Sequence, residues 1–316
     1  MPAAIQSIVW HSFPAIKLEN ESMSTVIVPD IGAKIVSLFD KVHSCEWLVP
    51  PMRPMKQNTP GQCFIDQDMS GWDEMMPTIV ACKWGDLDLP DHGEVWSIPW
   101  KLEKCSEGVK LSVCGQVMPY RLTRTASLIA SACLKLDYEL KNIGDKAFPW
   151  LWAAHPQFSA NLETRIILPD EVKRVINVID EDYIWGKAGT IHDWPLAASL
   201  NGDVWRLDHV RSPEKHTCRK FYIPPELHVD WAALQNESLG CKMKISWEKE
   251  KVPYLGLWVD EGKYNNASVV APEPSTGYYD NLNLAAANQK APILVPGEIA
   301  EWTIIVELDQ ATFKKF

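Results

Sequence analysis

Three segments of the sequence place an ionisable side chain beside proline or glycine, or at the end of an apolar run. They are residues 89–96, with Asp-His-Gly-Glu, residues 150–158, with His-Pro, and residues 271–278, with Pro-Glu-Pro. Glu273 lies between two prolines, and proline removes a backbone donor and restricts its neighbours. A carboxylate on so stiff a backbone is rigidly placed, which is what a general base requires.

Two histidines accompany this carboxylate in the other segments. His155 ends an apolar, aromatic run, so we expect it to be at least partly buried at the end of a strand. His92 precedes Gly93, which can supply a φ angle that other residues avoid. Taken one at a time, His155 is better explained as a core histidine and Glu273 as an acidic loop residue, and His92 is explained equally well as a turn residue.

The elements that must position these residues read as β-strands. Short runs rich in β-branched and aromatic residues recur between turn residues, and helical periodicity is nearly absent. The pattern predicts strands over residues 24–28, 33–40, 109–117, 122–129, 132–142, 239–247, 254–259, 267–271 and 300–308. The best helical candidate is 280–288, and the proline-rich stretch 49–60 is predicted as a long loop. We therefore predict an all-β fold, a large antiparallel β-sandwich with few short helices, in one domain over residues 1–316.

Composition bounds the partners and the compartment. The net charge is −10 and the basic residues form no cluster, which argues against a nucleic-acid or anionic-membrane partner. No apolar run approaches the ~20 residues of a membrane span, and no signal peptide is visible at the N-terminus. Eight cysteines are scattered without zinc-ligand spacing, so we expect reduced thiols, no metal site and a cytoplasmic location.

The order of these segments resembles that of the aldose 1-epimerase, or galactose mutarotase-like, superfamily. The resemblance rests on Asp-His-Gly at 91–93, His-Pro-Gln-Phe at 155–158 and Glu-Pro-Ser-Thr-Gly at 273–277. Residues 29–38 look like the opening hairpin of the family, and residues 296–304 look like its closing strand. The similarity thus extends over nearly the whole chain.

The resemblance implies a galactose mutarotase-like supersandwich and the interconversion of the α and β anomers of a free sugar. It implies that Glu273 takes the proton of the C1 hydroxyl and that His155 donates a proton to the ring oxygen. His92 would hydrogen-bond near the same oxygens. This chemistry implies a small-molecule sugar as partner and no metal or cofactor. The state of assembly is left open, with a homodimer as one option.

Other residues are weaker candidates for sugar binding. Asp73, Glu74 and Arg124 are candidates for hydrogen bonds to the sugar, and Trp72 and Trp96 for stacking on its ring. A solvated acidic pair and a buried arginine with an acidic partner are the alternatives. The family also has a mid-chain aspartate that contacts sugar hydroxyls, and here Asp208, Asp230 and Asp260 compete for that position.

The sequence departs from the family pattern in two places and leaves rival functions open. Gln157 interrupts the usual His-Pro-Tyr-Phe pattern, and residues 71–77 replace an arginine-bearing segment of some members. One rival is a carbohydrate-binding protein without catalysis, and another is a glycoside hydrolase or polysaccharide lyase. A third is a sugar-phosphate epimerase, for which the cations Lys34, Arg53 and Arg124 would have to converge.

Overall fold

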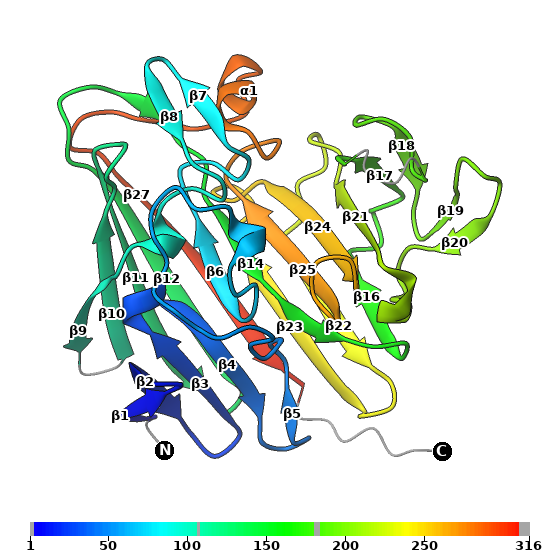
Figure 1. Ribbon diagram of the computed structural model, residues 1–316, viewed down its shortest axis with the longest axis horizontal. Coiled ribbons are helices and arrows are strands. Elements are labelled where there is room, and N and C mark those ends of the chain that lie inside the picture. Colours follow the sequence, from blue (N-terminus) through cyan, green and yellow to red (C-terminus); the bar gives the residue numbers. More distant parts are fainter. Residues whose placement is uncertain (1–2, 106–107, 180–183, 310–316) are drawn as a thin grey trace.

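Two large β-sheets pack face to face in this computed structural model, which describes residues 3–105, 108–179 and 184–309 (Figure 1). The larger sheet has the strand order β1-β2-β3-β4-β6-β14-β25-β24-β21-β17-β18, with β15 paired to β25 and β5 paired to β4. Its thirteen strands are β1 (Ala4–Trp10), β2 (Phe13–Glu19), β3 (Met23–Val28), β4 (Lys34–Asp40), β5 (Cys45–Glu46), β6 (Trp72–Met75), β14 (Ala153–Pro156), β15 (Phe158–Ala160), β17 (Arg174–Asn177), β18 (Ile191–Asp193), β21 (Thr217–Tyr222), β24 (Tyr254–Glu261) and β25 (Ser268–Ser275).

The smaller sheet has eight strands in the order β16-β22-β23-β27-β12-β11-β10-β9. They are β16 (Thr164–Ile167), β22 (Trp231–Asn236), β23 (Cys241–Trp247), β27 (Ile299–Leu308), β12 (Cys133–Asn142), β11 (Tyr120–Ala130), β10 (Gly108–Cys114) and β9 (Lys101–Cys105). Neighbouring strands run antiparallel in both sheets. The predicted all-β sandwich is therefore confirmed.

Short elements join and border the two sheets. Three two-stranded ribbons are β7 (Cys82–Trp84) with β8 (Leu87–Leu89), β13 (Phe148–Pro149) with β26 (Ile293–Leu294), and β19 (Leu196–Ala198) with β20 (Val204–Arg206). The helical elements are η1 (Pro29–Ile31), η2 (Phe64–Asp66), η3 (Val95–Ser97), η4 (Pro213–Lys215) and α1 (Leu282–Ala287). No helix in the described ranges has the length and apolar character needed to cross a membrane.

Alternating side chains build the core between the sheets. Along β12, Leu134, Leu136 and Leu140 are fully buried, whereas Lys135 and Asp137 between them are partly exposed. Side chains in a strand point to opposite faces by turns, so one face of β12 enters the core and the other meets solvent. Burying one leucine stabilises the fold by about 1.5–3 kcal/mol. One apolar cluster built in this way extends across both sheets.

The predicted elements agree with the observed ones in type and differ in length. Each of the nine predicted strand ranges coincides with a strand of the larger or smaller sheet. The predicted helix at 280–288 is shorter, since α1 covers only Leu282–Ala287 and begins after the Asn281 side chain caps the backbone N–H of Leu284. The proline-rich stretch 49–60 forms a loop without strand or helix, as predicted.

Candidate active site

A cavity of about 220 Å³ lies over the central strands β14, β25, β24 and β21 of the larger sheet. Its lining residues are Ile65, Met69, Ile79, Val80, His92, His155, Ile179, Lys220, Trp258, Tyr264, Glu273 and Asp280. Along β24, Leu255, Leu257 and Val259 belong to the apolar core, so Gly256 and Trp258 face the opposite side of the sheet. The cavity therefore sits on the face of the larger sheet that points away from the core.

Glu273 stands on β25 at the floor of this cavity and is 1% exposed. Its Oε1 lies 3.7 Å from Nε2 of His155, and its Oε2 lies 2.7 Å from Nζ of Lys220. Burial raises the pKa of Glu273, and the attraction of Lys220 opposes part of that rise. The carboxylate thus has one oxygen beside an imidazole and the other beside an ammonium group.

His155 reaches the cavity from β14, the strand next to β25, and is 4% exposed. Burial lowers the pKa of His155 well below its usual range, and the nearby His92, Lys220 and Lys34 lower it further. The free imidazole is therefore neutral near pH 7. Its Nδ1 has no hydrogen-bond partner among the described residues, so Nε2 is the nitrogen that faces the carboxylate.

His92 enters the cavity from a tight turn that precedes η3. His92 has φ +57° and Gly93 has φ +69°. A Cβ on Gly93 would lie 2.0 Å from the carbonyl oxygen of Met76, so this position requires glycine. The Nδ1 of His92 lies 2.9 Å from Oδ1 of Asp91, a carboxylate that can only accept, which leaves Nε2 for a ligand.

Phe64 holds the two histidines in place from η2. Its ring stacks on that of His92 with centroids 4.2 Å apart and planes 11° apart, and it meets the ring of His155 edge-on at 5.3 Å. The backbone N–H of Phe64 donates to Asp91 at 2.9 Å, so the same carboxylate ties down both the loop and His92. Phe64 is not among the predicted site residues, because a phenylalanine in a loop carries no signal of its own.

Lys220 and Asp280 also line the cavity, and neither is among the site residues predicted from the sequence. The Nζ of Lys220 on β21 lies 3.0 Å from Oδ1 of Asp280, to which the hydroxyl of Tyr222 also donates at 2.7 Å. Burial alone would lower the pKa of Lys220, but the attraction of Asp280 and Glu273 outweighs it and raises that pKa. Asp280 precedes α1 but falls within the predicted helical range 280–288, so the sequence does not mark it as a site residue.

The model of the family described as Aldose 1-epimerase matches residues 14–307 of this sequence. The chain belongs to the aldose 1-epimerase family. Solved structures of similar fold include a galactose mutarotase-like protein from Clostridium acetobutylicum, at 14% identity and TM-score 0.67, with 98% of this chain and 99% of that chain covered. Another, from Lactobacillus casei, has 17% identity and TM-score 0.65, with 93% of this chain and 100% of that chain covered. The Slr1438 protein from Synechocystis has 15% identity and TM-score 0.67, with 97% and 100% covered. Among curated proteins, no sequence matches this one.

In this aldose 1-epimerase family member, Glu74 and Arg124 form an ion pair between the sheets and do not line the cavity. Both side chains are 0% exposed, and Nη1 of Arg124 on β11 lies 2.6 Å from Oε1 of Glu74 on β6. Glu74 also accepts hydrogen bonds from the Tyr138 hydroxyl and the Trp152 indole, each at 2.8 Å. With its oxygens so engaged in the interior, Glu74 has the role of a core anchor, and Arg124 has the acidic partner that a buried arginine requires.

The other three candidates for sugar binding also lie outside the cavity. Asp73 is fully buried against Lys34, with 2.8 Å between Oδ2 and Nζ, and burial raises the pKa of Asp73 to about 6. Trp72 packs edge-on against Phe158 in the core. Trp96 lies behind Phe64 and donates its indole N–H to the carbonyl of Gly93 at 3.0 Å, so it supports the histidine turn from below. The position of these residues gives no support to sugar contact.

None of the three mid-chain aspartates that the sequence left in competition lines the cavity. Asp208 pairs with Arg206 at 2.7 Å, and Asp260 accepts backbone N–H groups of the turn that follows β24. Asp230 lies beside β23 on the smaller sheet, at another surface hollow. Asp280 is the aspartate that the fold brings to the cavity. Over the described ranges, no group of three or more His, Cys, Asp or Glu side chains is arranged to hold a metal ion.

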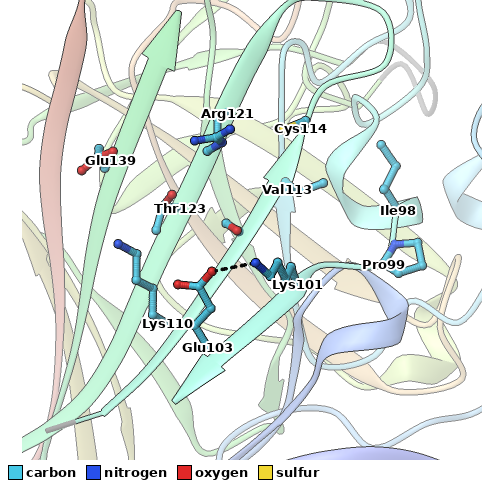
Figure 2. A pocket seen from close by; sticks show the side chains of 11 residues that line it. Ile98, Pro99, Lys101, Glu103, Lys110, Val113, Cys114, Arg121, Thr123 and Glu139 are labelled. Atoms are coloured by element: carbon cyan, nitrogen blue, oxygen red, sulfur yellow. Dashed lines mark ion pairs between the residues drawn. The ribbon is translucent and has the colours of Figure 1, made fainter. Parts of the chain in front are cut away.

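A second and larger hollow, of about 490 Å³, lies over β9, β10, β11 and β12 of the smaller sheet (Figure 2). Its charged lining residues are Lys101, Glu103, Lys110, Arg121 and Glu139. We call this hollow the outer groove.

Proposed function

We propose that this protein interconverts the α and β anomers of a free monosaccharide, with Glu273 as general base and His155 as general acid. The observation that carries the proposal is the 3.7 Å approach of His155 Nε2 to Glu273 Oε1 inside the cavity. The C1 hydroxyl oxygen and the ring oxygen of a pyranose are bonded to the same carbon. Two groups this close together can therefore each reach one of those oxygens within hydrogen-bonding distance.

The charge states of the pair define its active form. Burial raises the pKa of Glu273 and lowers that of His155. Because the two groups lie 3.7 Å apart, the charge of each affects the protonation of the other. The reactive form holds one titratable proton, on His155. Burial favours the neutral imidazole in the free protein, and the ionised carboxylate of Glu273, 3.7 Å away, favours the protonated form that acts as the acid. That proton passes to the ring oxygen as the C1–O bond of the ring breaks, while Glu273 takes the C1 hydroxyl proton and the aldehyde forms. Rotation about the C1–C2 bond and the reverse proton transfers close the ring on the other face.

His92 is placed to support this reaction. Its Nε2 is free because Nδ1 is held by Asp91, and its ring lies 5.4 Å from that of His155, centroid to centroid. A sugar hydroxyl that donates to Nε2 of His92 would orient the substrate between the two catalytic groups. Positioned acid and base groups typically contribute ~10²–10⁴-fold each, which suffices for a reaction that already proceeds slowly in water.

The size and charge of the cavity favour one small, uncharged ring. Its volume of about 220 Å³ is below the ~300 Å³ at which pockets for drug-sized ligands begin. Lys220 is the only lysine or arginine among the described lining residues, and it is already paired with two carboxylates. A monosaccharide fits these limits better than an oligosaccharide or a sugar phosphate does.

Three rival functions receive less support from the structure. The cations that a sugar-phosphate epimerase would need do not converge: Lys34 and Arg124 are paired in the interior, and Arg53 donates to backbone carbonyls of residues 65 and 67. A glycoside hydrolase needs room for a sugar on each side of the cleaved bond as well as two carboxylates. A binding protein without catalysis would have no need of the adjoining imidazole and carboxylate.

Anomer exchange measured by two-dimensional NMR tests the proposal directly. Single anomers of glucose, galactose, xylose and fucose, together with glucose 6-phosphate, are followed with and without the purified protein. We expect at least one neutral sugar to exchange faster than in buffer and glucose 6-phosphate to remain at the uncatalysed rate. Absence of acceleration for every sugar would refute the proposal, and saturable binding without acceleration would favour the binding protein.

A further inference from the structure

Glu273 is contacted from two sides, and the two contacts come from different strands. In the sheet, β25 lies between β14 and β24, and β21 follows β24. His155 approaches Oε1 from β14, whereas Lys220 approaches Oε2 from β21. Lys220 is thus two strands away from Glu273, a separation of about 10 Å between backbones. The lysine side chain must therefore extend across β24, the strand between β21 and β25.

Gly256 on that intervening strand leaves room for the Glu273 carboxylate to meet the lysine. In the sheet register, Tyr222 of β21 lies opposite Gly256, and Gly256 lies opposite Glu273. A Cβ at Gly256 would lie 3.3 Å from Oε2 of Glu273 and 3.4 Å from Cζ of Tyr222, which is tight at the first of these contacts. Gly256 lies within a strand and is not among the glycines with positive φ, so its backbone conformation does not require glycine. Its missing side chain instead leaves room for the carboxylate above it.

We propose that Lys220 is a positioning residue that binds one oxygen of Glu273 and leaves the other to act as base, with Gly256 as the gap that admits this contact. Lys220 is itself held by Asp280, which the Tyr222 hydroxyl fixes in turn. The carboxylate therefore cannot rotate its two oxygens freely, and Oε1 stays beside His155. The catalytic part of this inference rests on the proposed function, in which Glu273 is the base.

The charge of Lys220 also sets the pH range of the pair. The ionisable groups facing Glu273 are His155 of β14, Lys220 and Tyr222 of β21, Asp280 after β25 and His92 of the turn before η3. Of these, Lys220 is the cation in direct contact with the carboxylate. Its positive charge favours ionised Glu273 and neutral His155, so it lowers the pKa of both. Removing that charge must move both protonations to higher pH.

Titration of the Glu273 carboxyl group tests the inference without relying on activity. Glutamate labelled with ¹³C at the carboxyl carbon is incorporated, and the Glu273 signal is assigned by its loss in Glu273→Gln. In Lys220→Met, we expect Glu273 to titrate about 1–3 pH units higher than in the wild type, because an opposite charge at this distance shifts a carboxyl group by that amount. An unchanged titration would overturn the proposal.

Arg219→Met is the matched control. Arg219 is the next residue along β21, is equally buried and pairs with Glu261 at 2.6 Å on the opposite side of the strand from the cavity. This variant loses a buried cation and some stability, as Lys220→Met does, but we expect Glu273 to titrate as in the wild type. Equal shifts in both variants would mean that general destabilisation is responsible and would also overturn the proposal.

The pH profile of catalysed anomer exchange gives the second readout. In Lys220→Met, we expect the whole bell-shaped profile of kcat/KM to move to higher pH by the same 1–3 units or so. Lys220→Arg, which keeps the charge, should restore the wild-type position of the profile even where kcat is lower. A rise in KM with no displacement of the profile would make Lys220 a substrate-binding residue instead and would contradict its positioning role.

Gly256→Ala decides the matter if Lys220→Met does not fold. The added methyl group displaces Oε2 from Lys220, so we expect the Glu273 titration to move in the same direction by a smaller amount, and no movement would overturn the proposal. The two proposals fail separately. A protein that accelerates no sugar yet shows the Glu273 shift refutes the proposed function and keeps the lysine contact. A protein that accelerates anomer exchange but shows no Glu273 shift keeps the proposed function and refutes the lysine contact.

Discussion

The cavity over the larger sheet and the outer groove contain the same kinds of charged residue in opposite surroundings. In the cavity, the side chains of Lys220 and Glu273 are 7% and 1% exposed, and Nζ lies 2.7 Å from Oε2. In the outer groove, Lys101 and Glu103 are 76% and 48% exposed and lie 3.2 Å apart (Figure 2). The groove has more than twice the volume of the cavity, about 490 Å³ against about 220 Å³.

The comparison indicates that the burial of charged groups, and not the volume of a hollow, decides whether their pKa values are shifted. Water screens the charges of the outer groove, and an exposed ion pair of this kind contributes only ~0–1 kcal/mol. In the cavity, burial raises the pKa of Glu273 and lowers that of His155, and perturbed pKa values of this kind are typical of functional sites. Histidine is also absent from the described lining of the groove, whereas two histidines line the cavity.

Replacing one carboxylate in the cavity and one in the outer groove should give the largest difference in the rate of anomer exchange. Glu273→Gln removes the proposed base, so we expect catalysed anomer exchange to fall by ~10²–10⁴-fold. Glu139→Gln, a change of the same chemistry in the outer groove, should leave the rate within twofold or so of the wild type, as expected for a partly exposed residue outside the cavity. Exchange by NMR gives both rates, and circular dichroism confirms folding. Equal effects of the two substitutions would contradict the distinction between the hollows.

Arg124→Met tests whether the buried ion pair behind the cavity serves stability. The change leaves Glu74 buried without its cation, so we expect the free energy of unfolding, measured in urea, to fall by about 3–5 kcal/mol. The double variant Glu74→Gln with Arg124→Met should recover part of this loss, because no uncompensated charge remains. An Arg124→Met protein of unchanged stability with a higher KM for the sugar would instead show that Arg124 contributes to substrate binding.

Phe64→Leu tests the aromatic contact that holds both histidines. An aromatic pair contributes about 0.5–1.5 kcal/mol beyond its buried area, so we expect kcat/KM to fall by about threefold to tenfold. Phe158→Leu is the control, since Phe158 is equally buried and packs on Trp72 outside the cavity. It should lower thermal stability and leave kcat/KM unchanged. The same loss of kcat/KM in both variants would attribute the effect to folding.

Lys101→Ala in the outer groove should have the smallest effect. It breaks an exposed pair with Glu103, so we expect the free energy of unfolding to change by less than ~1 kcal/mol and the rate of anomer exchange to stay the same. Urea denaturation and NMR exchange measure the two quantities. A loss of activity here would link the outer groove to the cavity, and the comparison between them would no longer hold.

Much of the fold was predictable because long strands repeat a local pattern. β12 alternates apolar and polar residues over ten positions, which identifies both the strand and its buried face. β6, β14 and β21 were not predicted. Their residues are buried on both faces or nearly so, as in the pattern BBBB of β6 and β14, so no alternation marks them. Two of these strands, β14 and β21, carry His155 and Lys220.

The sequence by itself determined the three residues of unusual local setting: His92 beside a glycine with positive φ, His155 at the end of an apolar run, and Glu273 between two prolines. The backbone conformation at such a position depends on the residues next to it, so the sequence predicts it without knowledge of the fold. The tertiary structure alone decided which charged side chains form ion pairs. It paired Arg124 with Glu74 inside the core, and it brought Lys220 and Asp280 to Glu273 across two strands. Such pairings depend on sheet order and register, which join residues that are distant along the chain and leave no trace in the sequence around either one.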